Sequence, residues 1–299
     1  DNYPYPDYNK KFYDSNDVIC TISKLTDDIV RTVSPSTKAI RIPHTVDTDI
    51  FKKADHESVQ GFRSLIEGDR QKTIFFWNNR NARRKLSGSL IYWFKDFLEI
   101  VGEDNACLLM HTHPGDPHGQ DLRAIVNSLG LKENKQVLFS IEKLSPTELG
   151  KLYSSVDCTI NISDAEGFGL ATLESLACGT PIIVNMTGGL QEQVTDGEQC
   201  FGVGLEPASK VVIGSQEVPY IYEDRISKES FHAALDKMYY LGEEGRQELG
   251  QQGHRHVRTN YSFENFCQQW VDTMLQVHEE HGSWETRKGY NGIVFKEVA

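Results

Sequence analysis

Two glutamates that stand eight positions apart are the residues of this chain whose chemistry is easiest to interpret. Glu166 precedes the loop Gly167-Phe168-Gly169, and Glu174 falls in a segment whose apolar residues recur at helical spacing. A glycine-rich loop at the start of a helix leaves the first helical amides without internal partners, so they can bind phosphate oxygens. Because carboxylates repel phosphate, the glutamates are better suited to accept hydrogen bonds from sugar hydroxyls.

The residues around the glutamates predict a β-loop-α-β unit. Residues 156–162 and residues 182–184 have the apolar composition of buried strands. Gly179 stands where helices commonly end in a left-handed residue, and Pro181 follows it, so we expect the helix to end near Cys178.

A basic segment follows the strand predicted over residues 73–77. It contains Arg80, Arg83, Arg84 and Lys85, four cations within six residues. Such cations repel one another unless an anion is present, and arginine and lysine both bind phosphate oxygens. We therefore expect the segment to bind a diphosphate; the alternative is a solvated loop.

Three histidines, His111, His113 and His118, lie near Asp116 in the segment HTHPGDPHG. Their spacing lacks a rigid helix and a fourth committed ligand, so we expect loop histidines and no metal site. Nucleophile-elbow, Walker and HExxH motifs do not occur in the sequence.

The composition argues against several classes of protein. A net charge of −12 over 299 residues does not fit a nucleic-acid scaffold or a polybasic membrane patch. No apolar run has the length of a membrane span, and we expect no signal peptide before the fold. The six cysteines form no C-x-x-C pair, so we expect reduced thiols and a cytoplasmic location. The first residue is Asp1 rather than Met, which indicates a processed product, a fragment or an incomplete reading frame.

Strand and helix patterns alternate along the chain and predict an α/β fold with a doubly wound, parallel, Rossmann-like sheet. We expect strands at residues 18–22, 73–77, 106–110 and 137–141 in addition to those named above. Helices are expected at residues 86–102, 121–129, 226–241, 243–259 and 263–281, and a capping box at Ser145 starts one more. Ligands of such sheets bind at the carboxyl ends of the strands.

The spacing of the two glutamates, with GFGL after the first and GTPII after the helix, resembles the paired-glutamate signature of the family 4 glycosyltransferases. These are retaining enzymes of the GT-B fold, in which two Rossmann-like domains face each other across a cleft. The resemblance implies that Glu166 contacts hydroxyls of the donor sugar at the reaction centre and that Glu174 holds the ribose. It also implies that Arg80 and Lys85 bind the donor diphosphate, although Arg83 or Arg84 could substitute for Arg80.

By this resemblance the catalytic residues are Glu166, Arg80 and Lys85. The other donor-binding residues are Glu174, Gly167, Phe168, Gly169, Leu170, Asn79, Leu144, Gly188 and Gly189. The resemblance implies no cofactor and no metal, a UDP-, GDP- or ADP-sugar as co-substrate, and a glycan, lipid or protein acceptor.

The start of the chain resembles the end of the family's amino-terminal domain, with Ser23, Pro43, Val46, Asp47 and Phe51 in matching positions. The resemblance implies that residues 1–54 close the acceptor-side domain, that residues 55–265 bind the nucleotide sugar, and that residues 266–299 form a crossing helix and tail. Residues 1–11 are expected to be extended, and the polar residues 55–71 are expected to be a linker. Most of the amino-terminal domain would then lie outside this chain.

Our leading hypothesis is a retaining glycosyltransferase that transfers a hexose-type sugar from a nucleotide-diphosphate sugar. One alternative is a non-catalytic nucleotide-sugar-binding half of a split or truncated enzyme, which would pair with a separate amino-terminal domain. Another is a GT-B sugar-nucleotide epimerase, which would act without an acceptor.

Overall fold

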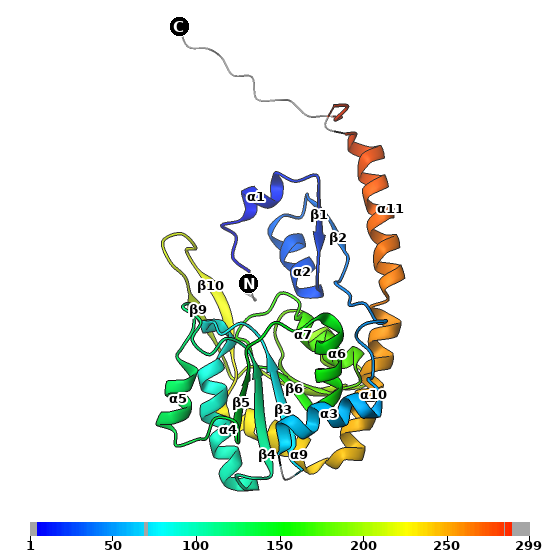
Figure 1. Cartoon of the computed structure of the whole chain (residues 1–299). Helices are drawn as coiled ribbons and strands as arrows, with labels where there is room; N and C mark the ends of the chain where they lie inside the picture. The colour runs from blue at the N-terminus through cyan, green and yellow to red at the C-terminus, as the bar shows by residue number, and fades with distance from the viewer. Residues whose placement is uncertain (1–4, 69–70, 284, 289–299) are drawn as a thin grey trace.

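The computed structural model describes residues 5–68, 71–283 and 285–288. Its centre is a six-stranded sheet in the order β5-β4-β3-β6-β7-β8, and every pairing in it is parallel (Figure 1). The doubly wound sheet predicted from the sequence is thus confirmed. Strand order reverses between β3 and β6, which is the point where such sheets bind ligands. The strands are β3 Thr73–Asn78, β4 Ala106–His111, β5 Val137–Ser140, β6 Cys158–Asn161, β7 Ile182–Asn185 and β8 Gly202–Leu205.

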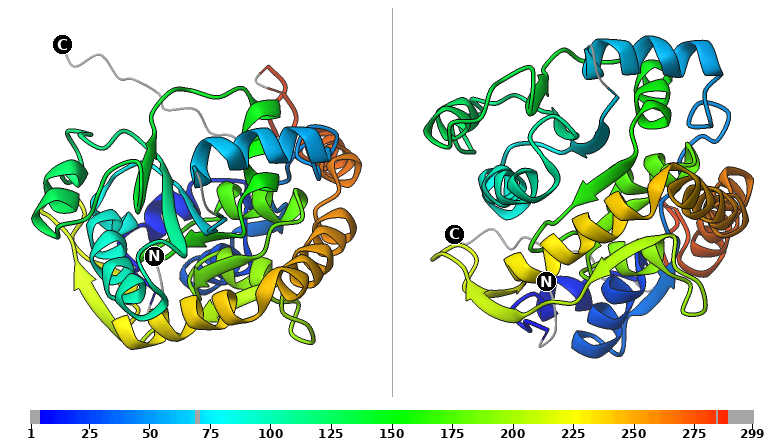
Figure 2. Two further views of the ribbon diagram at one scale, coloured as in Figure 1. Left: turned by 60° about the horizontal axis from the view of Figure 1, so that its bottom comes forward. Right: turned by 90° about the horizontal axis from the view of Figure 1, so that it is seen from below.

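Helices cover both faces of this sheet (Figure 2). On β3, Phe75 and Trp77 enter one core, whereas Ile74 and Phe76 enter the other, because successive side chains of a strand point to opposite faces. The first core is closed by α4 Ser87–Val101, α5 Leu122–Ser128 and α9 Lys228–Tyr240. The second is closed by α3 His56–Glu67, α6 Pro146–Ser155, α7 Leu170–Ala177, α8 Leu190–Val194 and α10 Gly242–Asn260.

The helix boundaries around the glutamates agree with the local sequence signals. Ser145 caps α6 by accepting from the Glu148 amide, and the Glu148 side chain accepts from the Ser145 amide in return. α7 ends at Ala177, and Gly179 has φ +80° as expected for a left-handed stop.

The linker predicted over residues 55–71 is wrong, because its middle forms the helix α3. Asp55 caps this helix by accepting from the Ser58 amide at 2.8 Å. Ile66 is buried and Phe62 half-buried on the face that packs against α6. Such a narrow apolar stripe in a polar segment is easily missed, since packing rather than composition stabilises the helix.

Several further elements were not predicted, among them β8. β9 Ser209–Ile213 and β10 Ile221–Arg225 form an antiparallel hairpin outside the central sheet, and α1 Lys10–Asp14 occupies the end of the lead-in that was expected to be extended.

A small amino-terminal unit lies over the carboxyl ends of the central strands (Figure 1). β1 Val18–Thr21 and β2 Lys38–Arg41 pair in parallel, and α2 Lys24–Val33 connects them. α11 Phe263–His281 runs from α10 to this unit, where Lys38 Nζ lies 3.0 Å from Glu280 Oε2 (Figure 1). Part of the predicted tail, residues 289–299, lies outside the described residues. Among the helices that the structure describes, none combines the length and apolar character needed to cross a membrane.

Candidate functional site

Two loops meet at the switch point of the sheet. Residues 79–86 follow β3, and residues 162–169 follow β6. The Asp164 amide donates to the Arg84 carbonyl at 2.9 Å, and Arg84 Nη1 donates to the Ala165 carbonyl at 2.6 Å. The basic loop and the glutamate loop predicted from the sequence are therefore joined to each other.

Lys85 and Glu166 form an ion pair at this junction. Lys85 is only 7% exposed. Burial lowers the pKa of Lys85, while the Glu166 carboxylate acts in the opposite direction. Arg84 Nη1 lies 3.6 Å from Glu166 Oε2, so a second cation borders the same carboxylate. Partly desolvated cations in fixed positions are well suited to stabilise negative charge that develops on a ligand.

Arg80 lies elsewhere. Its Nε atom is 2.8 Å from Asp116 Oδ2 in the loop after β4, and the side chain is 61% exposed. The hydrogen bond from Arg80, together with that from the His118 amide, lowers the pKa of Asp116 to about 2. The structure thus brings Arg84, rather than Arg80, to Glu166, and the role of Arg80 stays a prediction.

Glu174 sits on α7 at the end of a short hydrogen-bonded chain. The Tyr153 hydroxyl donates to Glu174 Oε2 at 2.9 Å and accepts from Asn78 Nδ2 at 2.8 Å. Burial raises the pKa of Glu174 to about 7, against the opposing effect of the Tyr153 hydrogen bond. Near neutral pH this carboxyl can therefore exist in either state, and its ionised form is a strong acceptor for hydroxyl groups.

The glycines at the site allow close contact between backbones. Gly169 has φ +91° at the start of α7, a conformation that side chains disfavour. A Cβ on Gly188 would lie 1.5 Å from the Glu166 carbonyl oxygen, and one on Gly189 would lie 2.7 Å from Phe168 Cα. The predicted glycine pair therefore packs directly against the glutamate loop.

The glutamate loop also touches the amino-terminal unit. A Cβ on Gly167 would meet Ile22 Cδ1 at 3.4 Å, and the Phe168 ring packs edge-on against His44 with centroids 5.3 Å apart. Phe168 is 3% exposed, so its side chain holds the loop instead of facing solvent.

Three other predicted donor-binding residues have side chains that are at least partly accessible. Leu170 is 47% exposed at the first position of α7, and Leu144 is half-buried against the second core. Asn79 is half-buried, and its Nδ2 atom has no hydrogen-bond partner among the described residues. A buried donor of this kind usually bonds to water or a ligand.

The histidine segment does not assemble a metal site within the part of the chain that the structure describes, where no group of three potential ligands converges. His111 Nδ1 lies 2.9 Å from Ser140 Oγ on the neighbouring strand, and burial lowers the pKa of His111.

Sequence reasoning missed the partners of the site, including Asn78, Tyr153 and Asp164. Asp164 is fully buried, and Arg225 Nη1 of the hairpin lies 2.7 Å from Asp164 Oδ2. Burial raises the pKa of Asp164 to about 7, although Arg225 opposes this. The β-branched run at residues 211–213, closed by a glycine, could have indicated the hairpin, but no local signal connects it to Asp164.

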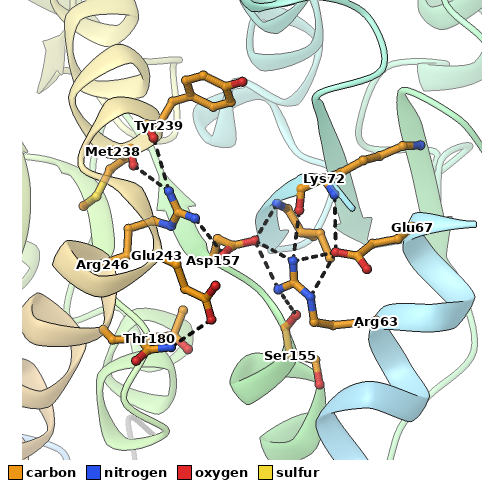
Figure 3. Close-up of polar contacts among 12 residues, drawn as sticks. Arg63, Glu67, Lys72, Ser155, Asp157, Thr180, Met238, Tyr239, Glu243 and Arg246 are labelled. Atoms are coloured by element: carbon orange, nitrogen blue, oxygen red, sulfur yellow. Dashed lines mark hydrogen bonds and ion pairs between the residues drawn. The ribbon is translucent and has the colours of Figure 1, made fainter. Parts of the chain in front are cut away.

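A second charged cluster surrounds Asp157, which directly precedes β6 and so lies at the amino-terminal edge of the sheet. Figure 3 shows its side chains. Arg63 Nη1 and Arg246 Nη2 lie 3.2 and 3.1 Å from the two oxygens of Asp157. The same guanidinium groups donate to the carbonyls of Ser155 and Met238 at 3.1 Å. A hollow of about 940 Å³ opens here, but these cations are already bound within the chain. We therefore place the functional site at the carboxyl edge.

Comparisons with known proteins identify the family of this chain. The family model described as Glycosyl transferases group 1 matches residues 97–255. D-inositol 3-phosphate glycosyltransferase of Acidothermus cellulolyticus is 32% identical over 157 residues, which cover 44% of this chain and 34% of that protein. N-acetyl-alpha-D-glucosaminyl L-malate synthase of Bacillus anthracis is 22% identical over 228 residues, which cover 76% and 56%. The chain thus spans about a third of the first relative and just over half of the second.

Solved structures support the fold. Sucrose-phosphate synthase from Thermosynechococcus elongatus superposes with a TM-score of 0.72 at 20% identity, covering 91% of this chain and 61% of that one. Anabaena HepE in complex with UDP-glucose superposes with a TM-score of 0.70 at 14% identity, covering 91% and 69%. The GT-B fold class expected from the sequence is confirmed. Because the family model covers more than half of its residues, this chain belongs to the group 1 glycosyl transferases.

Proposed function

We propose that this chain is the donor-binding part of a retaining glycosyltransferase that transfers a hexose-type sugar from a nucleotide-diphosphate sugar. The observation that carries the proposal is the partly desolvated Lys85 and Glu166 pair, bordered by Arg84, beside the glycine-rich start of α7 at the switch point of the sheet. Such a site offers cations, free helical amides and a carboxylate to one ligand.

In the proposed complex the diphosphate lies between the basic loop and the first amides of α7. Breaking the anomeric C–O bond places negative charge on the leaving diphosphate, and Lys85 and Arg84 stabilise that charge without a metal. Glu166 orients the sugar through its hydroxyls. The acceptor attacks the anomeric carbon on the face that the diphosphate leaves, so the configuration is retained, and the acceptor proton passes to the diphosphate.

Glu174 binds the ribose in this proposal. One of its oxygens already accepts from Tyr153, which fixes the orientation of the carboxylate. The other oxygen is then directed to the ribose hydroxyls. Arg80 joins the diphosphate only if it leaves Asp116, so we assign it a smaller role than Lys85.

Thermal stabilisation by UDP-, GDP- and ADP-sugars tests the proposal, because a ligand that binds the native state raises its melting temperature. We expect one nucleotide class to stabilise the protein, and UDP-glucose is tested first since it is the ligand in the HepE complex. Calorimetry then compares Lys85→Ala and Glu174→Ala with Lys95→Ala, a control whose lysine pairs with Glu99 on the surface. Unchanged affinity in both site variants would contradict the assignment.

A second candidate is a binding half that needs a separate amino-terminal domain. It is favoured by the two-strand sheet of the described amino-terminal unit, which is much smaller than the six-stranded sheet of the donor-binding part. Donor binding without transfer, with activity restored by an added amino-terminal domain, would support this candidate. Transfer by the chain alone would exclude it.

A further inference from the structure

The hairpin of β9 and β10 contacts both loops of the site through the side chains of two residues of β10. Glu223 is 1% exposed and accepts from both terminal nitrogens of Arg83, at 3.0 and 2.7 Å. Arg225 lies two positions later, on the same face of the strand, and its Nη1 atom is 2.7 Å from Asp164 Oδ2. One strand outside the central sheet therefore contacts the basic loop and the glutamate loop.

Asp164 is the residue where these three segments join. Its amide donates to the Arg84 carbonyl and its carbonyl accepts from the Asp224 amide, each at 2.9 Å. Asp164 stands two positions before Glu166, and its side chain is completely buried. The place of Glu166 consequently depends on how Asp164 is held.

The hairpin itself is attached to the rest of the chain at several points. Asp224 accepts from Thr187 Oγ1 at 3.0 Å through one carboxylate oxygen, and through the other it accepts at 2.6 Å from Lys210 Nζ of β9, which joins the two strands of the hairpin. The Asp224 carbonyl accepts from Asn185 Nδ2, also at 3.0 Å. Toward its tip, the Tyr220 hydroxyl donates to Asp7 at 2.8 Å, which connects the hairpin to the amino-terminal segment. A support fixed at several points can in turn fix the loop that it contacts.

Resting on the function proposed above, we propose that Arg225 and Asp164 form a positioning pair through which the hairpin holds the Glu166 loop in place for the donor sugar. The pair acts through the loop, and neither residue is assigned a contact with the donor. A buried carboxylate without a countercharge is strongly unfavourable, so loss of Arg225 forces Asp164 to take up a proton or to move toward water. Either response changes the path of the loop.

The charges around Asp164 agree with this role. Arg225 and Arg83 face it as cations, whereas Glu223 and Asp224 are nearby carboxylates. Arg225 Nη1 makes the one direct ion pair to Asp164 among the described residues. Removing this cation therefore leaves Asp164 with carboxylates as its nearest charged neighbours on β10.

The test compares the affinity for a nucleoside diphosphate with the affinity for the matching nucleotide sugar, in the wild type and in Arg225→Ala. Because Glu166 serves the sugar and Glu174 the ribose, we expect the affinity for the nucleoside diphosphate to stay within about twofold. The ratio of the affinity for the nucleotide sugar to that for the nucleoside diphosphate measures what the sugar contributes. This ratio should fall about tenfold, which corresponds to the loss of roughly one charge-assisted hydrogen bond. Arg123→Ala, which removes an exposed ion pair to Glu133, is the matched control.

Amide hydrogen exchange gives a readout that needs no donor. We expect faster exchange at residues 162–169 in Arg225→Ala, with exchange in β4 unchanged. Pairing Arg225→Met with Asp164→Asn removes both charges and should restore most of the protection that Arg225→Met alone loses. In Arg225→Lys, which keeps the charge, the exchange rate at residues 162–169 should be intermediate between those of the wild type and Arg225→Ala. Arg225→Lys replaces Arg225→Ala in the experiment if Arg225→Ala does not fold.

Two results would overturn the positioning pair: unchanged exchange at residues 162–169, or an equal loss of affinity for the nucleoside diphosphate and the nucleotide sugar. If no nucleotide sugar binds even the wild type, the proposed function fails, and the exchange experiment still decides whether the hairpin holds the loop.

Discussion

One ion-pair cluster lies just before β6 and another lies just after it. The two clusters differ in how many of their charged groups are bound by other groups of the protein. Before the strand, Asp157 is shared by Arg63 and Arg246, whose remaining nitrogens also donate to backbone carbonyls (Figure 3). After the strand, Glu166 meets Lys85 at a junction of two loops.

We propose that this difference separates a structural cluster from a functional one. The cluster at Asp157 joins α3, α10 and the start of β6, and its donors are directed at the protein's own acceptors. Glu174 stands on α7, eight positions after Glu166, and burial raises its pKa to about 7, so the chain keeps an ionisable group near neutrality after this strand. Groups held in this unfavourable state are characteristic of binding and catalytic sites.

The largest effect is expected from Asp157→Ala. The change leaves two mostly buried guanidinium groups without their shared carboxylate, and breaking such a buried pair costs about 3–5 kcal/mol of unfolding free energy. Denaturant unfolding measures this loss. Nucleotide-sugar affinity of the folded protein should stay at the wild-type value, and a stable variant with weakened donor binding would reverse our assignment of the two clusters.

Lys85→Ala should show the opposite behaviour. Loss of a cation that binds the diphosphate is expected to weaken nucleotide-sugar binding by about 2–3 kcal/mol, or roughly 100-fold. Its effect on stability should be smaller, because burial already disfavours the charged lysine. Calorimetry and chemical unfolding of the same preparation provide both numbers; a large stability loss with normal binding would make Lys85 structural.

The pH dependence of donor binding comes next in size. Glu174 has its pKa raised to about 7 in the folded protein, and its ionised form is the better acceptor for ribose hydroxyls. Affinity for a nucleotide sugar should therefore increase about tenfold between pH 6 and pH 8. Glu174→Gln should flatten this dependence, while Asp164 continues to titrate in the same range in both proteins.

The raised pKa of Glu174 also makes the stability of the fold depend on pH. Stability should decrease as pH rises, whereas donor affinity should increase. A carboxyl that binds its proton more tightly in the folded state than in the unfolded state stabilises the fold below its unfolded pKa. That contribution is lost as pH rises through the folded pKa, here about 7. Wild type should thus lose more stability than Glu174→Gln between about pH 4.5 and pH 7, and parallel curves would contradict the shift.

Tyr153→Phe should give the smallest effect. It removes the hydroxyl that donates to Glu174 and accepts from Asn78, at an expected cost of about 1 kcal/mol in unfolding free energy. Since this hydrogen bond lowers the pKa of Glu174, its loss should move the midpoint of the binding profile to higher pH. A midpoint that does not move would show that Tyr153 only fills the core.

The sequence predicted the sheet well because its signals are local. Alternating apolar strands, the capping box at Ser145 and the stop at Gly179 each depend on a few neighbouring residues. The prediction failed at α3, where packing against α6 stabilises a segment whose own composition is polar. It also missed the hairpin, because the β-branched run at residues 211–213 does not show where such a strand packs.

By itself, the sequence determined that two glutamates and a basic loop follow strands of a parallel sheet, since helix and strand patterns are properties of contiguous residues. Only the tertiary structure decided that Arg84 instead of Arg80 reaches Glu166, and that Arg225 meets Asp164. These contacts join residues far apart in the chain. Their geometry depends on how loops from different strands pack, which no local pattern specifies.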